Sequence, residues 1–238
     1  LKYLLWLSAV VPVVSMADLT WRVDFNGTTS GTESTPAFTG WAVGTASRTQ
    51  TFSNVDGGPV NSDITITLNG TGGTTHNNYQ RNMPGGSATN LFRDAAQYNG
   101  LDQGDSLTIN MSGLDAGGSY QLRLWYYDYS FGSSATQSFF DVTDGGNTFL
   151  GSLTNTANSV AAGNPALPTD LYDSRYVLTA DVNAGVGGTL AINLVTGNSN
   201  QKINGLELIA VVPEPSSVAL FGVSGVVCWL WRRRQRAG

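Results

Sequence analysis

Short segments in which hydrophobic and polar residues alternate fill most of the chain between residues 18 and 212. In residues 64–68 isoleucine and leucine alternate with threonine, and residues 190–194 alternate in the same way. Successive side chains of a strand point to opposite faces, so each segment predicts a strand with one face in a core and one in water. Glycine pairs, such as those at 117–118 and 187–188, separate the segments as turns do.

Strands are predicted along the whole of this region, and helix almost nowhere. The predicted strands cover residues 20–25, 41–44, 49–55, 63–68, 106–111, 120–128, 137–143, 148–153, 176–182, 189–195 and 203–211. Only residues 90–98 have helical spacing of apolar positions. Asp144-Gly145 provides the positive φ that a tight hairpin requires. We therefore expect an all-β, antiparallel two-sheet sandwich, with a jelly roll favoured over an immunoglobulin-like arrangement.

The N-terminal residues differ from this pattern because they form a continuous apolar run. Lys2 precedes the apolar residues 3–14, and the triplet Ser15-Met16-Ala17 puts small residues at the positions that a signal peptidase reads. Residues 1–17 are therefore predicted to be a Sec-type signal peptide cleaved after Ala17. The Sec translocon and signal peptidase are the partners that this prediction implies.

A second apolar run, residues 218–231, follows the triplet Pro213-Glu214-Pro215 near the C-terminus. As a helix it is about 21 Å long, which makes it a marginal transmembrane helix for a hydrocarbon core of roughly 30 Å. It ends at a cluster of arginines that we expect on the cytoplasmic side: Arg232, Arg233, Arg234 and Arg236. The prolines keep the triplet out of the helix and extended, as a processing enzyme requires. The alternative is an ordinary stop-transfer helix.

This order of a Pro-Glu-Pro triplet, a short apolar helix and an arginine cluster resembles the PEP-CTERM sorting signal of exported Gram-negative proteins. The resemblance covers residues 212–236. It implies transient anchoring in the inner membrane, cleavage by an exosortase-type enzyme, and delivery to the cell surface or extracellular matrix. The expected organisation is a signal peptide at 1–17, a β-sandwich domain at 18–211 and a sorting tail at 212–238.

Residues 107–128 read as a strand, a glycine-rich turn at 112–119 and a second strand. Together with Phe92-Arg93-Asp94 and the final strand 203–208, they resemble galactose-binding-like jelly-roll modules found beside bacterial glycan-active enzymes. The resemblance implies the fold only, because ligand sites vary widely among such modules.

One strand of this segment suggests a glycan-binding face. Leu122 and Leu124 are expected to face the core from one side of this strand. Arg123, Trp125 and Tyr127 must then share its opposite face. Aromatic rings bury the apolar side of a sugar, and a guanidinium donates hydrogen bonds to its hydroxyls. On such an open platform, Trp125→Ala is expected to weaken glycan binding with little effect on stability. The alternative is that loops cover this face and the rings are ordinary packing.

Charge and cysteine content narrow the partners of the mature domain. The 12 basic and 17 acidic residues of the chain fall to 7 and 16 once Lys2, the four tail arginines and Glu214 are set aside, leaving a net charge of −9. Such an acidic domain does not favour nucleic acid or anionic membrane surfaces. The single cysteine, Cys228, lies in the tail, so the mature domain has no disulfide.

Residues for catalysis are few. His76 is the only histidine, and the domain has no cysteine beside it, which argues against a zinc site or a thiol nucleophile. Asp94, Asp128, Asp141 and Glu207 are available as the paired carboxylates of a glycoside hydrolase.

Residues 141–147 place several oxygens in one loop and could hold Ca²⁺, although a plain hairpin is favoured; no other cofactor is indicated. The sequence therefore predicts an exported, non-catalytic, glycan-binding or structural β-sandwich protein whose partner is extracellular polysaccharide. The alternative is a secreted carbohydrate-active hydrolase that uses paired carboxylates.

Overall fold

The structure is a computed structural model, and most of the β-rich region is described in it. The described residues are 20–25, 37–43, 48–53, 63–71, 75–80, 91–92, 94–99, 105–128, 135–155, 168–196 and 200–211. The predicted signal peptide at 1–17 and the sorting tail at 212–238, with its transmembrane helix, lie outside this set and stay predictions as structural elements. Within the described set, no helix has the length and hydrophobicity needed to cross a membrane.

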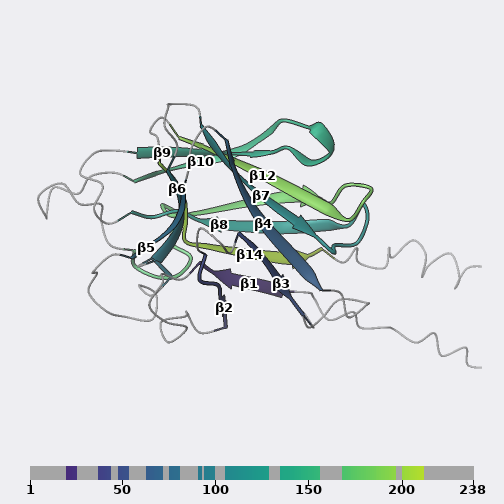
Figure 1. Ribbon diagram of the computed structural model, residues 1–238, viewed down its shortest axis with the longest axis horizontal. Coiled ribbons are helices and arrows are strands. Elements are labelled where there is room, and N and C mark those ends of the chain that lie inside the picture. The colour runs from purple at the N-terminus through teal and green to yellow at the C-terminus, as the bar shows by residue number, and fades with distance from the viewer. Residues whose placement is uncertain are drawn as a thin grey trace, which may run out of the picture.

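The described residues form fourteen strands in three sheets (Figure 1). The five-stranded sheet has the order β11 (Val177–Asn183), β8 (Ser119–Trp125), β14 (Gly205–Ala210), β1 (Thr20–Asp24) and β2 (Thr39–Gly40). The six-stranded sheet has the order β10 (Thr148–Asn155), β9 (Ala135–Asp141), β12 (Thr189–Thr196), β7 (Ser106–Ser112), β4 (Ile64–Thr71) and β3 (Thr49–Phe52). The small sheet has the order β13 (Asn200–Ile203), β6 (Asp94–Asn99) and β5 (Thr75–Gln80).

Eight of these strands are paired as in a jelly roll. In chain order they are β1, β7, β8, β9, β10, β11, β12 and β14. The first pairs with the eighth, the second with the seventh, the third with the sixth and the fourth with the fifth, always antiparallel. Such nested pairing is a long hairpin rolled around a core, with β2, β3 and β4 added at the edges. The predicted all-β jelly-roll sandwich is confirmed.

The core lies between the two large sheets and follows the predicted alternation. In β4 the isoleucines and Leu68 are buried while Thr65 and Thr67 are only partly buried. Leu122 and Leu206, from the five-stranded sheet, are buried in the same cluster. Figure 1 shows β4, β7 and β12 crossing β8 and β14 at an angle, as packed twisted sheets do.

Besides β5, which forms where no strand was predicted, two segments differ from the prediction. Of residues 90–98, expected to form a short helical turn, 91–92 are helical, but 94–99 form β6 because their backbone pairs with β5 on one side and β13 on the other. Tyr98 packs where Gly70 has no side chain; a Cβ there would lie 2.1 Å from its ring. Residues 41–44 were expected to form a strand, but the strand at this place is the two-residue β2, which runs parallel to β1. Long-range pairing thus decides both segments.

The turn between β9 and β10 was predicted correctly. It contains a single 3-10 turn over Thr143–Gly145, with φ of 52° at Asp144 and 80° at Gly145. These positive φ values are the ones that an Asp-Gly pair accommodates.

Candidate functional site

A row of three charged side chains crosses the outer face of the five-stranded sheet. The strand registers place Glu207 on β14 directly between Arg22 on β1 and Arg123 on β8. Arg22 Nε donates to Glu207 Oε1 and Arg123 Nη1 donates to Oε2, each at 2.5 Å. Glu207 is 0% exposed, and two guanidinium groups on one carboxylate offset the cost of burying its charge.

The two arginines keep part of their side chains in water while they bind Glu207. Burial alone lowers the pKa of Arg22, but its hydrogen bond and charge attraction to Glu207, with smaller contributions from Tyr172, raise this pKa above the ordinary value overall. Two positive groups and one negative group leave this patch locally cationic on an acidic domain. Arg123 Nη2 also donates to Gln121 Oε1 at 2.9 Å, which fixes the second guanidinium in place.

Trp125 and Tyr127 lie on this same outer side, but they are not accessible. Leu122 and Leu124 belong to the main core whereas Trp125 and Tyr127 belong to a second apolar cluster, so the predicted division between faces is confirmed. Trp125 is 0% exposed and Tyr127 1%, however, so the expectation of an open aromatic platform is wrong. Other members of the second cluster cover them: Phe38, Leu91, Phe92 and Tyr176.

The segment 168–176 covers these rings, and Asp173 organises it. The Asp173 carboxylate accepts hydrogen bonds from Thr169 N at 3.0 Å and from Arg175 Nε at 2.9 Å. Hydrogen bonding from Arg175 is the main cause that holds the pKa of this carboxyl well below its usual range; burial acts in the opposite direction. Trp125 Nε1 donates to Leu171 O at 2.7 Å and so ties the segment to β8.

Tyr172, in the same segment, is the aromatic residue that this face presents to water. It is 44% exposed, and its ring centroid lies 6.0 Å from that of Trp125. The guanidinium carbon of Arg123 lies 5.2 Å from the Tyr172 ring centroid, within the range of a cation–π contact. Tyr172, Arg22 and Arg123 therefore form the accessible part of this face, which we call the Tyr172 face. The sequence pattern does not identify Tyr172, because it lies in an irregular segment.

Three of the four acids considered for hydrolysis have structural partners. Glu207 binds the two arginines, and the buried Asp128 forms an ion pair with the buried Lys202. Asp141 Oδ1 accepts a hydrogen bond from Thr143 N at 2.9 Å within the hairpin turn. The side chain of Asp94 lies outside the description.

The described residues that were considered for metal binding do not form a metal site. In the described part of the chain, no three His, Cys, Asp or Glu residues are grouped closely enough to hold a metal ion. Asp144, in the loop considered for Ca²⁺, accepts a hydrogen bond from Val186 N at 3.3 Å. The Ca²⁺ site stays a prediction, and the side chain of His76 on β5 is not described.

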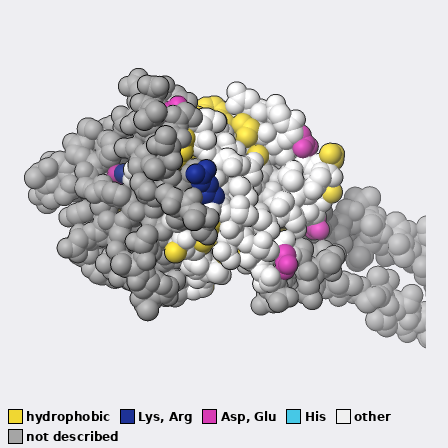
Figure 2. Space-filling view, in the orientation of Figure 1, with side chains coloured by type: hydrophobic (Ala, Val, Ile, Leu, Met, Phe, Trp, Pro, Cys, Tyr) yellow, Lys and Arg dark blue, Asp and Glu magenta, His cyan; other side chains and the backbone are white. Residues whose placement is uncertain are grey.

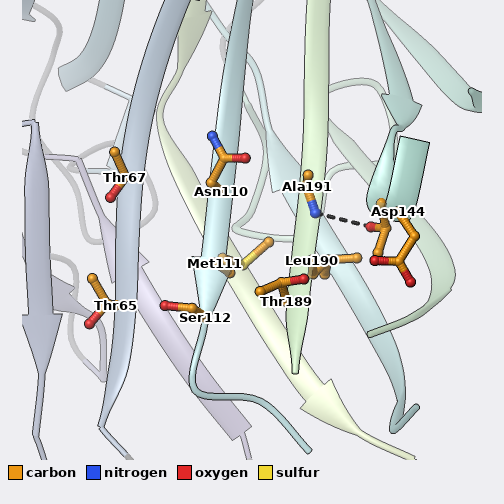
Figure 3. Close-up of a pocket in the computed structure, with 10 residues that line it drawn as sticks. Thr65, Thr67, Asn110, Met111, Ser112, Asp144, Thr189, Leu190 and Ala191 are labelled. Carbon is orange, nitrogen blue, oxygen red and sulfur yellow. Dashed lines mark hydrogen bonds between the residues drawn. The ribbon is translucent and has the colours of Figure 1, made fainter. Parts of the chain in front are cut away.

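A shallow groove of about 270 Å³ lies on the outer face of the six-stranded sheet, on the opposite side of the sandwich (Figure 3). Its lining comes from three neighbouring strands and from the turn after β9. The polar residues that line it are Thr65, Thr67, Asn110, Ser112, Thr143, Asp144 and Thr189. Alternating threonines in the sequence predict this wet face, but they do not predict the groove.

The structure search found remote similarities. The chain resembles CBM35 from Cellvibrio japonicus Abf62 at 16% identity and a TM-score of 0.34, over 58% of this chain and 82% of that one. It also resembles a family 35 carbohydrate binding module from Clostridium thermocellum at 10% identity and a TM-score of 0.33, over 67% and 96%. Bacteroides uniformis beta-glucuronidase 2 matches at 14% identity and a TM-score of 0.41, over 82% of this chain but 18% of that chain.

A search of the curated proteins found no match. The C-terminal segment, by contrast, matches a family model. Residues 211–234 match the PEP-CTERM protein-sorting motif, which confirms the prediction for this segment. The motif implies export and indicates processing by exosortase.

Proposed function

We propose that the chain is a surface or exopolysaccharide-matrix protein whose β-sandwich binds glycan without cleaving it, through the Tyr172 face. The observation that carries the proposal is the exposed Tyr172 ring, whose centroid lies 5.2 Å from the Arg123 guanidinium carbon and 6.0 Å from the Trp125 ring centroid. A half-exposed ring with fixed N–H donors beside it can stack on the apolar side of a sugar and bind its hydroxyl groups.

In this proposal Trp125 and Tyr127 act as positioning residues. Trp125 packs against the Tyr172 ring and holds Leu171 through its indole N–H. Tyr127 packs against Tyr176 with ring centroids 4.8 Å apart, at the end of the covering segment. Arg123 is the member of the predicted trio that contacts the ligand directly.

Affinity electrophoresis of the purified protein through gels that contain bacterial exopolysaccharide tests the proposal. Burying one ring face at about 25 cal/mol per Å² contributes about 1–2 kcal/mol, so Tyr172→Ala should weaken binding roughly ten-fold. Tyr172→Phe keeps the ring and is the matched control, which should bind within about two-fold of the parent. Unchanged mobility of Tyr172→Ala in every gel that retards the parent protein would overturn the proposal.

A reducing-sugar assay on each glycan that binds separates this function from hydrolysis. The proposal expects binding without release of reducing ends. Release that persists in Tyr172→Ala and disappears when one of the candidate acids is replaced would instead favour the hydrolase.

A further inference from the structure

Four strands of the six-stranded sheet carry an ordered array of short, mostly polar side chains on their outward side. In β7 the residues Leu107, Ile109 and Met111 are buried, while the residues between them face outward. The same division holds in β4 and β12. The outward positions that this leaves on four adjacent strands are Thr49 and Thr51 on β3, Thr65, Thr67 and Asn69 on β4, Thr108, Asn110 and Ser112 on β7, and Thr189, Ala191, Asn193 and Val195 on β12. We call this set the threonine face.

Register aligns these side chains into rows that run across the strands. One row joins Thr51, Thr65, Ser112 and Thr189 through three consecutive strand pairs. Strands lie about 4.8 Å apart, and alternate residues of one strand about 6.7 Å apart, so the side chains form a regular grid.

Hydrogen bonds within the array fix its side chains. The hydroxyls of Thr51 and Thr65 lie 2.9 Å apart, and Thr108 donates to Asn193 Oδ1 at 3.1 Å. A hydroxyl in such a pair still has capacity for a ligand, because each one has one donor and two acceptor sites. The threonine face is therefore set in position before any ligand arrives, which lowers the entropic cost of binding.

The groove is the part of the threonine face that can enclose a ligand. Figure 3 shows Thr65, Thr67, Asn110, Ser112 and Thr189 on one side of the sheet, with Asp144 beyond β12. The turn that carries Asp144 is fastened to β12, since Ala191 N donates to Thr143 Oγ1 at 3.0 Å and Val142 N donates to Ala191 O at 2.9 Å. The groove, about 270 Å³, is close to the lower limit of small-molecule pockets, about 300 Å³.

Charge decides which ligand suits this surface. The threonine face contains no ionisable side chain, although the chain as a whole carries 12 basic and 17 acidic residues. The nearest charge at the groove is the Asp144 carboxylate, which repels an anionic ligand. The described surface in Figure 2 is likewise mostly polar uncharged side chains and backbone, with few basic groups. Protein interfaces, by comparison, are enriched in aromatic residues, Met and Arg; on this side of the sheet the aromatic pair Phe140 and Phe149 lies on β9 and β10, beside the threonine face and not within it.

We propose that the threonine face binds a neutral polysaccharide, with one part of the chain in the groove beside Asp144. Repeated hydroxyl groups along the polymer would meet the repeated hydroxyl and amide groups of the grid. This site is on the opposite side of the sandwich from the Tyr172 face and does not depend on it. A protein with both sites would cross-link two polysaccharide chains.

The double variant Thr65→Val/Thr67→Val tests the proposal, because valine keeps the shape and the strand preference of threonine but removes its hydroxyl. Affinity gels with neutral polysaccharides (dextran, xylan, galactomannan and amylose) and with anionic ones (alginate and polygalacturonate) are the probes. The matched control is Thr136→Val/Thr154→Val, which removes a similar hydroxyl pair, 2.8 Å apart, at the β9–β10 edge away from the groove. Far-ultraviolet circular dichroism and the urea midpoint verify that each variant is folded.

At least one neutral gel should retard the parent protein, and the Thr65→Val/Thr67→Val variant should bind it roughly ten-fold more weakly, as the loss of two hydrogen bonds implies. The control variant and Tyr172→Ala should keep this retardation. Equal retardation of the folded groove variant and the parent, or retardation by anionic gels alone, would overturn the proposal. So would a parent dimer that dissociates in Thr65→Val/Thr67→Val, because the face would then be an interface between copies.

Discussion

Replacing Trp125 with alanine should destabilise the domain strongly, in contrast to the expectation from the sequence. The side chain is 0% exposed, its ring contacts Phe38 at a centroid distance of 5.5 Å, and its indole N–H binds Leu171 O. Truncation of a buried tryptophan removes its transfer free energy and leaves a cavity, at a cost of about 3–5 kcal/mol. Typical domains are stable by about 5–15 kcal/mol, so this loss is a large fraction of the total.

Urea unfolding followed by far-ultraviolet circular dichroism measures this cost without relying on tryptophan fluorescence. The midpoint should fall while the slope of the transition stays the same, because the surface exposed on unfolding hardly changes. Trp125→Phe keeps a ring in the cluster but loses the hydrogen bond to Leu171 O, and should cost about 1–2 kcal/mol. Tyr172→Ala, at a partly exposed position, should cost about 1 kcal/mol or less.

The order of these three variants is the decisive result. If Trp125→Ala loses less than about 1 kcal/mol, as exposed substitutions do, the ring is open to solvent and the covering role of residues 168–176 is wrong. In that case the aromatic platform predicted from the sequence would stand, and glycan binding should fall in Trp125→Ala itself.

Other outcomes follow from the same structure. Gly113→Ala should lower the free energy of unfolding in urea by about 2–4 kcal/mol, since φ is 89° and the new Cβ would lie 2.1 Å from Asp63 O. Gly117→Ala, where φ is 70° and the space around the new Cβ is open, is the control and should cost about 1 kcal/mol. Equal costs would exclude the backbone clash as the cause. The pKa of Asp173 is lower in the folded state than in the unfolded chain. The ionised carboxylate therefore stabilises the fold above the ordinary aspartate pKa of about 3.9, and this contribution is lost as pH falls below that value. The difference in unfolding free energy between the parent and Asp173→Asn should shrink from pH 6 toward pH ~3. A constant difference across that range would show that Asp173 acts through its shape alone. Mass spectrometry of surface material from the native host should detect no peptide from residues 218–238, and recovery of the intact C-terminus would mean that the tail is kept as an anchor.

The sequence predicts the faces of the strands well because a two-residue period is a local property. Alternation at Ile64, Thr65 and Ile66 identifies both the core side and the threonine face, and the same parity separates Leu124 from Trp125. The sorting motif at residues 211–234 is predicted equally well, since it is contiguous in the chain.

Which segment packs over the outer face of a sheet depends on distant parts of the chain, and the sequence does not predict it. Residues 168–176 have no periodicity, and their shape depends on the several hydrogen bonds of Asp173. The sequence offers Glu207 as a catalytic carboxylate, yet it is bound by Arg22 and Arg123 because three strands from distant parts of the chain align. Strand β6 is likewise decided by its partners on both sides and not by its own residues.

The place of β14 has a consequence for the order of events during export. It is the last strand of the described chain, yet it lies inside its sheet between β1 and β8, and it carries Glu207 to both arginines. The sandwich cannot close until this strand has crossed the membrane. Six residues lie between Val211 and the apolar run that begins at Val218, so at most about 25 Å of extended chain separates them. With the apolar run in the membrane, as the sequence predicts, folding would be completed beside the membrane, and every chain that carries the sorting tail would also carry the strand that closes the domain.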